Sequence, residues 1–219
     1  MEKFFRVLGL AAMRKMVLLL GCCLGLSLMA FPAFADSIGP NCGTCQGSIY
    51  TLTYSTIGTN MFQITYTIDT SGYNGGGTLL DNVAFKVSSS DPTGVSLVSA
   101  PNGAANWTVQ TGGINAGGCS GSGSGFVCAG ANSLSSAAAV PGGTYSWVFD
   151  ITTTGLFTSA NEASIKARYT NSSGNKVGAL VSEDITLQPN DAVPEPASLL
   201  LVGSGLMGVF GFSKRRLRA

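Results

Sequence analysis

Two stretches of alternating residues, YTLTYS at residues 50–55 and FQITYTI at residues 62–68, decide the fold class. In each stretch the apolar side chains recur at every second position, which is the period of a β-strand with one buried face. The same alternation returns at residues 83–87, 107–109, 145–151 and 165–169, and clusters of Gly, Asn, Ser and Pro separate the runs. Short alternating runs between turn signals predict an all-β fold of roughly eight strands, an antiparallel β-sandwich of the jelly-roll or Ig-like type.

The aromatic side chains of these runs share the apolar phase of their strands. Tyr50 and Tyr66 alternate with threonines, and Trp147 and Phe149 fall on the same phase as Tyr145 and Ile151. This phase predicts that the rings pack in the core and do not form an exposed platform for stacking sugars.

The first 35 residues have the organisation of an export signal. A basic segment precedes an uncharged apolar run at residues 16–29, and Ala33 and Ala35 are the small residues that a signal peptidase reads. The run is shorter than the roughly 20 residues of a membrane span. The sequence predicts an N-terminal signal helix, removed after Ala35. Lipoprotein processing at Cys22 and a translation start at Met13 or Met16 are the alternatives.

The last 27 residues combine a proline motif, an apolar run and a basic end. The apolar run at residues 199–212 would cover only about 21 Å as a helix, against a hydrocarbon core of about 30 Å. Pro194 and Pro196 flank Glu195 and keep this stretch extended and open to a protease. We predict a short C-terminal transmembrane helix that holds the chain temporarily, with an ordinary stop-transfer helix as the alternative. Four basic residues stop it on the cytoplasmic side: Lys214, Arg215, Arg216 and Arg218.

This order resembles the PEP-CTERM sorting signal. The resemblance implies that Pro194, Glu195 and Pro196 are recognised by exosortase, a membrane enzyme, and that the protein is associated with exopolysaccharide and biofilm. Residues 41–188 also resemble, more loosely, small PEP-CTERM proteins that share the NCGTCQGSIYTL start and have no assigned activity. The expected organisation is a signal peptide at residues 1–35, an extracytoplasmic β-sandwich domain at 36–192 and a sorting segment at 193–219.

The composition of residues 36–192 excludes several function classes. This region has four basic and nine acidic residues, which give it a net charge of about −5. It has no basic cluster in the sequence, which argues against nucleic acid as a partner. The chain has no histidine, so His-dependent catalytic triads and His-bearing zinc sites are excluded.

Two pairs of acidic residues are candidates for a catalytic pair or a metal site, and neither is favoured. Glu183 and Asp184 are adjacent, so in a strand they point to opposite faces, and we interpret them as solvated surface. Asp69 and Asp81 could offer oxygens to a calcium ion, but no loop register supports that site. We predict no metal and no cofactor.

Four cysteines remain after signal removal: Cys42, Cys45, Cys119 and Cys128. An even count in an exported chain predicts two disulfides, and three pairings are possible. We favour Cys119 with Cys128, because the Gly/Ser loop between them can close easily. Redox chemistry or a four-cysteine zinc site are the alternatives for the C-x-x-C motif.

The sequence as a whole predicts a non-enzymatic protein, exported through the inner membrane to the cell surface or beyond. Its expected role is a structural or interaction component of an exopolysaccharide or biofilm matrix. A carbohydrate-binding module is the second hypothesis, and a carboxylate-dependent hydrolase is the third. The expected partners are signal peptidase, exosortase, the inner membrane transiently, and polysaccharide.

Overall fold

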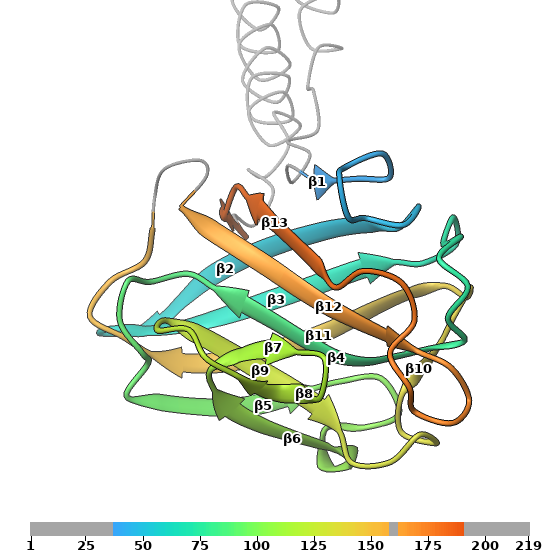
Figure 1. Ribbon diagram of the computed structural model, residues 1–219. Helices are drawn as coiled ribbons and strands as arrows, with labels where there is room; N and C mark the ends of the chain where they lie inside the picture. Colours follow the sequence, from blue (N-terminus) through green and yellow to red (C-terminus); the bar gives the residue numbers. More distant parts are fainter. Residues whose placement is uncertain (1–36, 158–161, 191–219) are drawn as a thin grey trace, which may run out of the picture. The chain divides into compact units, whose positions relative to one another are not determined.

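The computed structural model describes residues 37–157 and 162–190, and Figure 1 shows their arrangement. The chain there forms two six-stranded sheets, a separate two-stranded hairpin and one short 3-10 helix, η1 (Ala104–Asn106). The described residues belong to one compact unit by their contacts.

The first sheet, sheet A, is built around the two alternating stretches at residues 50–55 and 62–68. Its strands lie in the order β1 (Ser37–Ile38), β2 (Ile49–Gly58), β3 (Met61–Asp69), β11 (Thr144–Thr152) and β5 (Gly94–Ser99), and β14 (Gln188–Pro189) pairs with β2. The β14–β2 pair is parallel, and the other pairs of this sheet are antiparallel.

The second sheet, sheet B, is antiparallel throughout its described pairs. Its order is β13 (Val181–Ile185), β12 (Ala163–Thr170), β4 (Leu79–Lys86), β9 (Phe126–Ala131) and β6 (Trp107–Thr111), and β10 (Ala138–Ala139) pairs with β4. The hairpin consists of β7 (Gly113–Asn115) and β8 (Gly118–Gly121).

Aromatic side chains join the two sheets face to face. The rings of Phe85 in β4 and Phe149 in β11 are 4.8 Å apart, and those of Trp107 and Trp147 are 5.4 Å apart, both in edge-to-face geometry. All four side chains are buried in one hydrophobic cluster that draws on both sheets. The predicted all-β, antiparallel class is therefore confirmed, and the aromatic residues of the apolar phase do form its core.

A second apolar cluster lies on the other side of sheet B. Ala84, Ile114, Phe126 and Cys128 are buried there, where the β7–β8 hairpin contacts β4 and β9. Because β4 is covered on both faces, its six central residues are all buried, as is usual for a strand between two layers.

The predicted signal helix and C-terminal transmembrane helix lie outside the described residues. Within residues 37–157 and 162–190 no helix is long and apolar enough to cross a membrane.

Candidate functional site

The sorting residues fall where the structure gives no description. Ala33, Ala35, the motif Pro194–Pro196 and the basic end all lie outside residues 37–157 and 162–190. Their roles therefore stay predictions from the sequence.

The four cysteines of the β-domain form two disulfides, and Cys119 is paired with Cys128 as we favoured. The Cα atoms of Cys119 and Cys128 are 5.6 Å apart, and their disulfide links β8 to β9. It fixes the hairpin over the outer face of sheet B, next to the second apolar cluster.

Replacing both Cys119 and Cys128 by serine is expected to lower the free energy of unfolding by roughly 2–3 kcal/mol, the chain-entropy value for a loop of about this length. Urea unfolding with the other disulfide intact measures it. Serine replacement of Cys42 and Cys45, whose bond spans only 3 positions in sequence, is the matched comparison and should cost less. A larger loss for the shorter loop would contradict this account.

The Cys42–Cys45 loop is anchored to the edge strand β13 by Glu183. The backbone N–H and the hydroxyl of Thr44 both donate to Oε1 of Glu183, each at 2.6 Å, and the N–H of Ser182 donates to the Thr44 hydroxyl at 3.0 Å. The interpretation of Glu183 as solvated surface was therefore wrong, whereas Asp184 is exposed. The motif leads through turns into β2 and not into a helix, unlike a thioredoxin-type site.

Tyrosine hydroxyls form a buried network beside this loop. The Tyr169 hydroxyl lies 2.9 Å from that of Tyr50 and 3.0 Å from that of Ser48, and Tyr50 donates to the carbonyl of Cys45 at 3.3 Å. Burial raises the pKa of Tyr169 to about 12 and the pKa of Tyr50 and Tyr66 well above the usual value. These hydroxyls therefore remain protonated at neutral pH and serve as hydrogen-bonding groups of the core.

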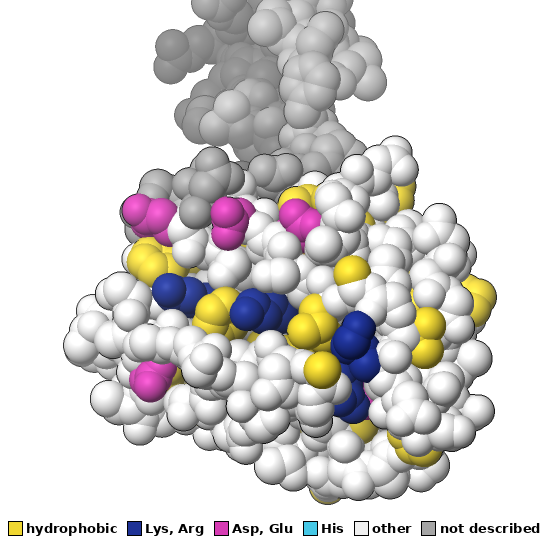
Figure 2. All heavy atoms as spheres, viewed as in Figure 1, with side chains coloured by type: hydrophobic (Ala, Val, Ile, Leu, Met, Phe, Trp, Pro, Cys, Tyr) yellow, Lys and Arg dark blue, Asp and Glu magenta, His cyan; other side chains and the backbone are white. Residues whose placement is uncertain are grey.

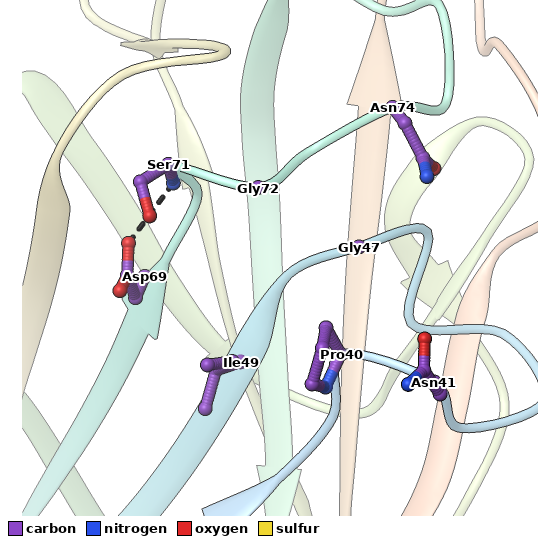
Figure 3. Close-up of a pocket in the computed structure, with 8 residues that line it drawn as sticks. All are labelled: Pro40, Asn41, Gly47, Ile49, Asp69, Ser71, Gly72 and Asn74. Carbon is purple, nitrogen blue, oxygen red and sulfur yellow. Dashed lines mark hydrogen bonds between the residues drawn. The ribbon is translucent and has the colours of Figure 1, made fainter.

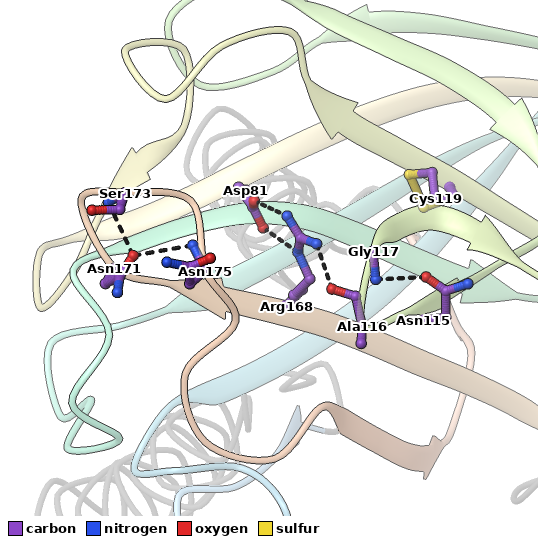
Figure 4. Close-up of polar contacts among 10 residues, drawn as sticks. Asp81, Asn115, Ala116, Gly117, Cys119, Arg168, Asn171, Ser173 and Asn175 are labelled. Atoms are coloured by element: carbon purple, nitrogen blue, oxygen red, sulfur yellow. Dashed lines mark hydrogen bonds and ion pairs between the residues drawn. A yellow bond between two sulfur atoms is a disulfide. The ribbon is translucent and has the colours of Figure 1, made fainter.

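Asp81 is held by Arg168 (Figure 4). The Nε and Nη2 atoms of Arg168 donate to the two carboxylate oxygens of Asp81, at 3.0 and 2.5 Å, and Nη1 donates to the carbonyl of Ala116 at 2.7 Å. Both charged residues are buried. The guanidinium thus joins β4, β12 and the β7–β8 connection, and Asp81 is occupied by this ion pair. The pair was not predicted from the sequence, since alternation places Arg168 on the outer face of its strand without indicating a partner.

A shallow cleft of about 310 Å³ lies between the loop before β2 and the loop after β3 (Figure 3). Its lining is Pro40, Asn41, Gly47, Ile49, Asp69, Ser71, Gly72 and Asn74. The Asp69 carboxylate accepts the N–H of Ser71 at 2.9 Å, and this bond lowers its pKa. Asp69 is thus a turn-stabilising residue. Among the described residues no three His, Cys, Asp or Glu side chains are grouped so as to hold a metal ion.

Comparisons with solved structures give only weak likenesses. A GH20 exo-β-N-acetylglucosaminidase from Vibrio harveyi matches at 14% identity and a TM-score of 0.29, over 65% of this chain and 18% of that one. The collagen-binding domain of a Staphylococcus aureus adhesin matches at 10% identity and a TM-score of 0.25, over 64% of this chain and 96% of that domain. The chain thus spans under a fifth of the length of the first of these proteins, and scores this low support no argument about fold or function.

Comparisons of sequence are more informative at the C-terminus. No curated protein matches the chain significantly. The family described as "PEP-CTERM protein-sorting motif" matches this chain at residues 192–216. This segment includes Pro194, Glu195, Pro196 and the start of the basic end. The chain therefore carries a PEP-CTERM protein-sorting motif, the signal of an exosortase-sorted surface or extracellular protein.

Proposed function

We propose that this protein is a non-enzymatic structural or interaction component of an exopolysaccharide or biofilm matrix. Signal peptidase cuts after Ala35, the segment 193–219 is held briefly in the inner membrane, and exosortase then releases the domain of residues 36–192 to the cell surface or exterior. The sorting motif at residues 192–216 carries this proposal.

The chemistry of the β-domain supports residence outside the cytoplasm. Two disulfides staple it, and disulfides persist in oxidising compartments. The large aromatic side chains, Trp147 and Tyr66 among them, are buried. This burial favours a structural or interaction protein over a carbohydrate module that stacks sugars on exposed rings. A glycan array tests the choice: saturable binding that is lost on changing a partly exposed aromatic residue, such as Tyr54 or Tyr145, would favour the module.

Replacing Pro194, Glu195 and Pro196 together by alanine is expected to keep the protein in the membrane fraction with its tail attached. Membrane fractionation and the intact mass of the protein from its native host measure the effect. The matched control replaces Ser172 and Ser173, exposed in the turn after β12, by alanine, and should be processed normally. If the wild-type protein from native cells still carries Arg216 and Arg218, the proposed release by exosortase is contradicted.

A further inference from the structure

The four basic residues of the described chain gather on one face, the outer face of sheet B. Figure 2 shows them as a line across this face. Lys166 and Arg168 occupy alternate outward positions of β12, whereas Ile165 and Ala167 between them face the core. The described residues contain seven acidic side chains against these four, so the strip is a local concentration of positive charge on a region that is negative as a whole.

Strand register explains the line. Lys86 of β4 lies opposite Ser164, the outward residue that precedes Lys166 in β12. Lys176, in the turn after β12, lies opposite Thr170, which is itself fully buried. The cations thus follow β12 from position 164 to position 170, although only Ser164 and Lys166 of this strand's outward positions are partly exposed. At about 6.8 Å for every two residues, the row extends over roughly 20 Å.

Among the described residues, three of the four cations have no carboxylate partner, although the Lys176 ammonium donates to the carbonyl of Gly178. Arg168 is buried and paired with Asp81, whereas Lys86 and Lys166 are half-buried and Lys176 is exposed. The Lys166 ammonium lies 4.6 Å from the centre of the Phe126 ring, and that of Lys86 lies 6.0 Å from the centre of the Phe157 ring. Such rings hold the ammonium groups in place without neutralising them.

Acidic and apolar groups border the same row. Asp184 in β13 lies opposite Ser164, and Asp91 accepts the N–H of Gly125 beside the row's other flank. Apolar side chains lie between the cations in Figure 2. A ligand on this strip therefore meets spaced positive charges, apolar contacts and carboxylates that accept hydrogen bonds from hydroxyl groups.

We propose that the cation row of Lys86, Lys166 and Lys176 binds an extended acidic polysaccharide that spans the three lysines on the surface of the domain. Carboxylates on the sugar chain pair with the lysines, the C–H faces of the sugars contact the apolar side chains, and sugar hydroxyls donate to the flanking carboxylates. Duplex DNA fits less well, because its densely spaced phosphates would be repelled by Asp184 and Asp91. This inference rests on the proposed function for the presence of matrix polysaccharide and adds its charge class and its binding face.

A binding assay with immobilised polygalacturonate tests the proposal. It uses the full-length chain, purified in a neutral detergent. Dextran serves as the neutral polymer and a duplex DNA fragment as the other polyanion. The chain should bind polygalacturonate, with an affinity that falls steeply as salt is added, and should not bind dextran. The triple variant K86Q/K166Q/K176Q should bind at least about tenfold more weakly, and Lys176→Gln alone about threefold, given typical contributions of lysines near an anionic surface.

The matched control lowers the net charge by the same three units on the other sheet. Thr59→Asp, Ser99→Asp and Ser146→Asp together alter exposed positions of sheet A or of its β2–β3 turn. They should leave binding within about twofold, because packed sheets lie about 10 Å apart and physiological salt screens exposed charges over about that distance. Equal losses in both triple variants, equal or tighter binding to duplex DNA, or no binding to polygalacturonate would each overturn the proposal. Because the assay measures purified protein, its failure leaves the sorting proposal intact, whereas a retained C-terminal tail in native cells would overturn sorting and leave the binding result unchanged.

Discussion

Replacing Arg168 by alanine is expected to lower the free energy of unfolding by about 3–5 kcal/mol, the usual effect of removing one partner of a buried ion pair. The loss is large because Asp81 would stay buried without its countercharge. The carbonyl of Ala116 would also lose the guanidinium that joins it to β12. A domain of ordinary stability, about 5–15 kcal/mol, would be weakened severely.

Urea unfolding of the wild type and variants measures this effect. Lys166→Gln is the matched control two residues away on the same strand, and its half-buried, outward position should limit the loss to about 1 kcal/mol. The double variant Asp81→Ala with Arg168→Met removes both charges, so it should be more stable than Arg168→Ala alone. A loss below about 1 kcal/mol in the single variant would show that the pair contributes little to the fold.

The alternation of apolar residues predicted the strands and the core well. YTLTYS and FQITYTI became β2 and β3, and their apolar residues Tyr50, Leu52, Ile64 and Tyr66 are fully buried. A period of two indicates which side of a strand is buried. For the centres of β2 and β3 this is enough, since Thr51, Thr53, Thr65 and Thr67 occupy their outer positions.

What alternation does not report is which distant residues meet. Glu183 and Thr44 are separated by 139 positions in sequence, and Arg168 and Asp81 by 87, so neither contact leaves a local pattern. The hairpin over sheet B was missed for the same reason. Its residues are mostly Gly, Asn and Ser, which signal a loop, and its packing depends on Ile114 and on the disulfide of Cys119 with Cys128. The cation row likewise emerges only when β4 and the turn after β12 are placed in register with β12.

The domain is expected to unfold cooperatively between about pH 10 and pH 12, because its buried tyrosines resist ionisation. An unfolded tyrosine ionises near pH 10. Burial raises the pKa of Tyr169 to about 12, and the pKa of Tyr50 and Tyr66 well above the usual value. Below pH 10 both states keep these protons, so the stability is fully present there. Above pH 10 only the unfolded chain releases them, and the free energy of unfolding falls by ~1.4 kcal/mol per pH unit for each tyrosine, or ~4 kcal/mol for the three.

Tyrosinate absorbance and far-UV circular dichroism, recorded together after rapid pH jumps, test this expectation. Tyr54 and Tyr145 are only partly buried, so both are first replaced by phenylalanine in every variant compared. In that background the two signals should change in one step, because ionisation of a buried tyrosine requires unfolding. Tyr169→Phe removes one of the three titrating groups and should reduce the slope of stability against pH by about one third, to ~2.7 kcal/mol per unit. Phe149→Leu is the matched control, since it weakens the same core without removing a titrating group and should shift the curve without changing its slope. Tyrosinate that appears near pH 10 while the circular dichroism stays native would mean that these hydroxyls reach solvent in the folded protein, and the buried network would then not be the cause of alkaline unfolding.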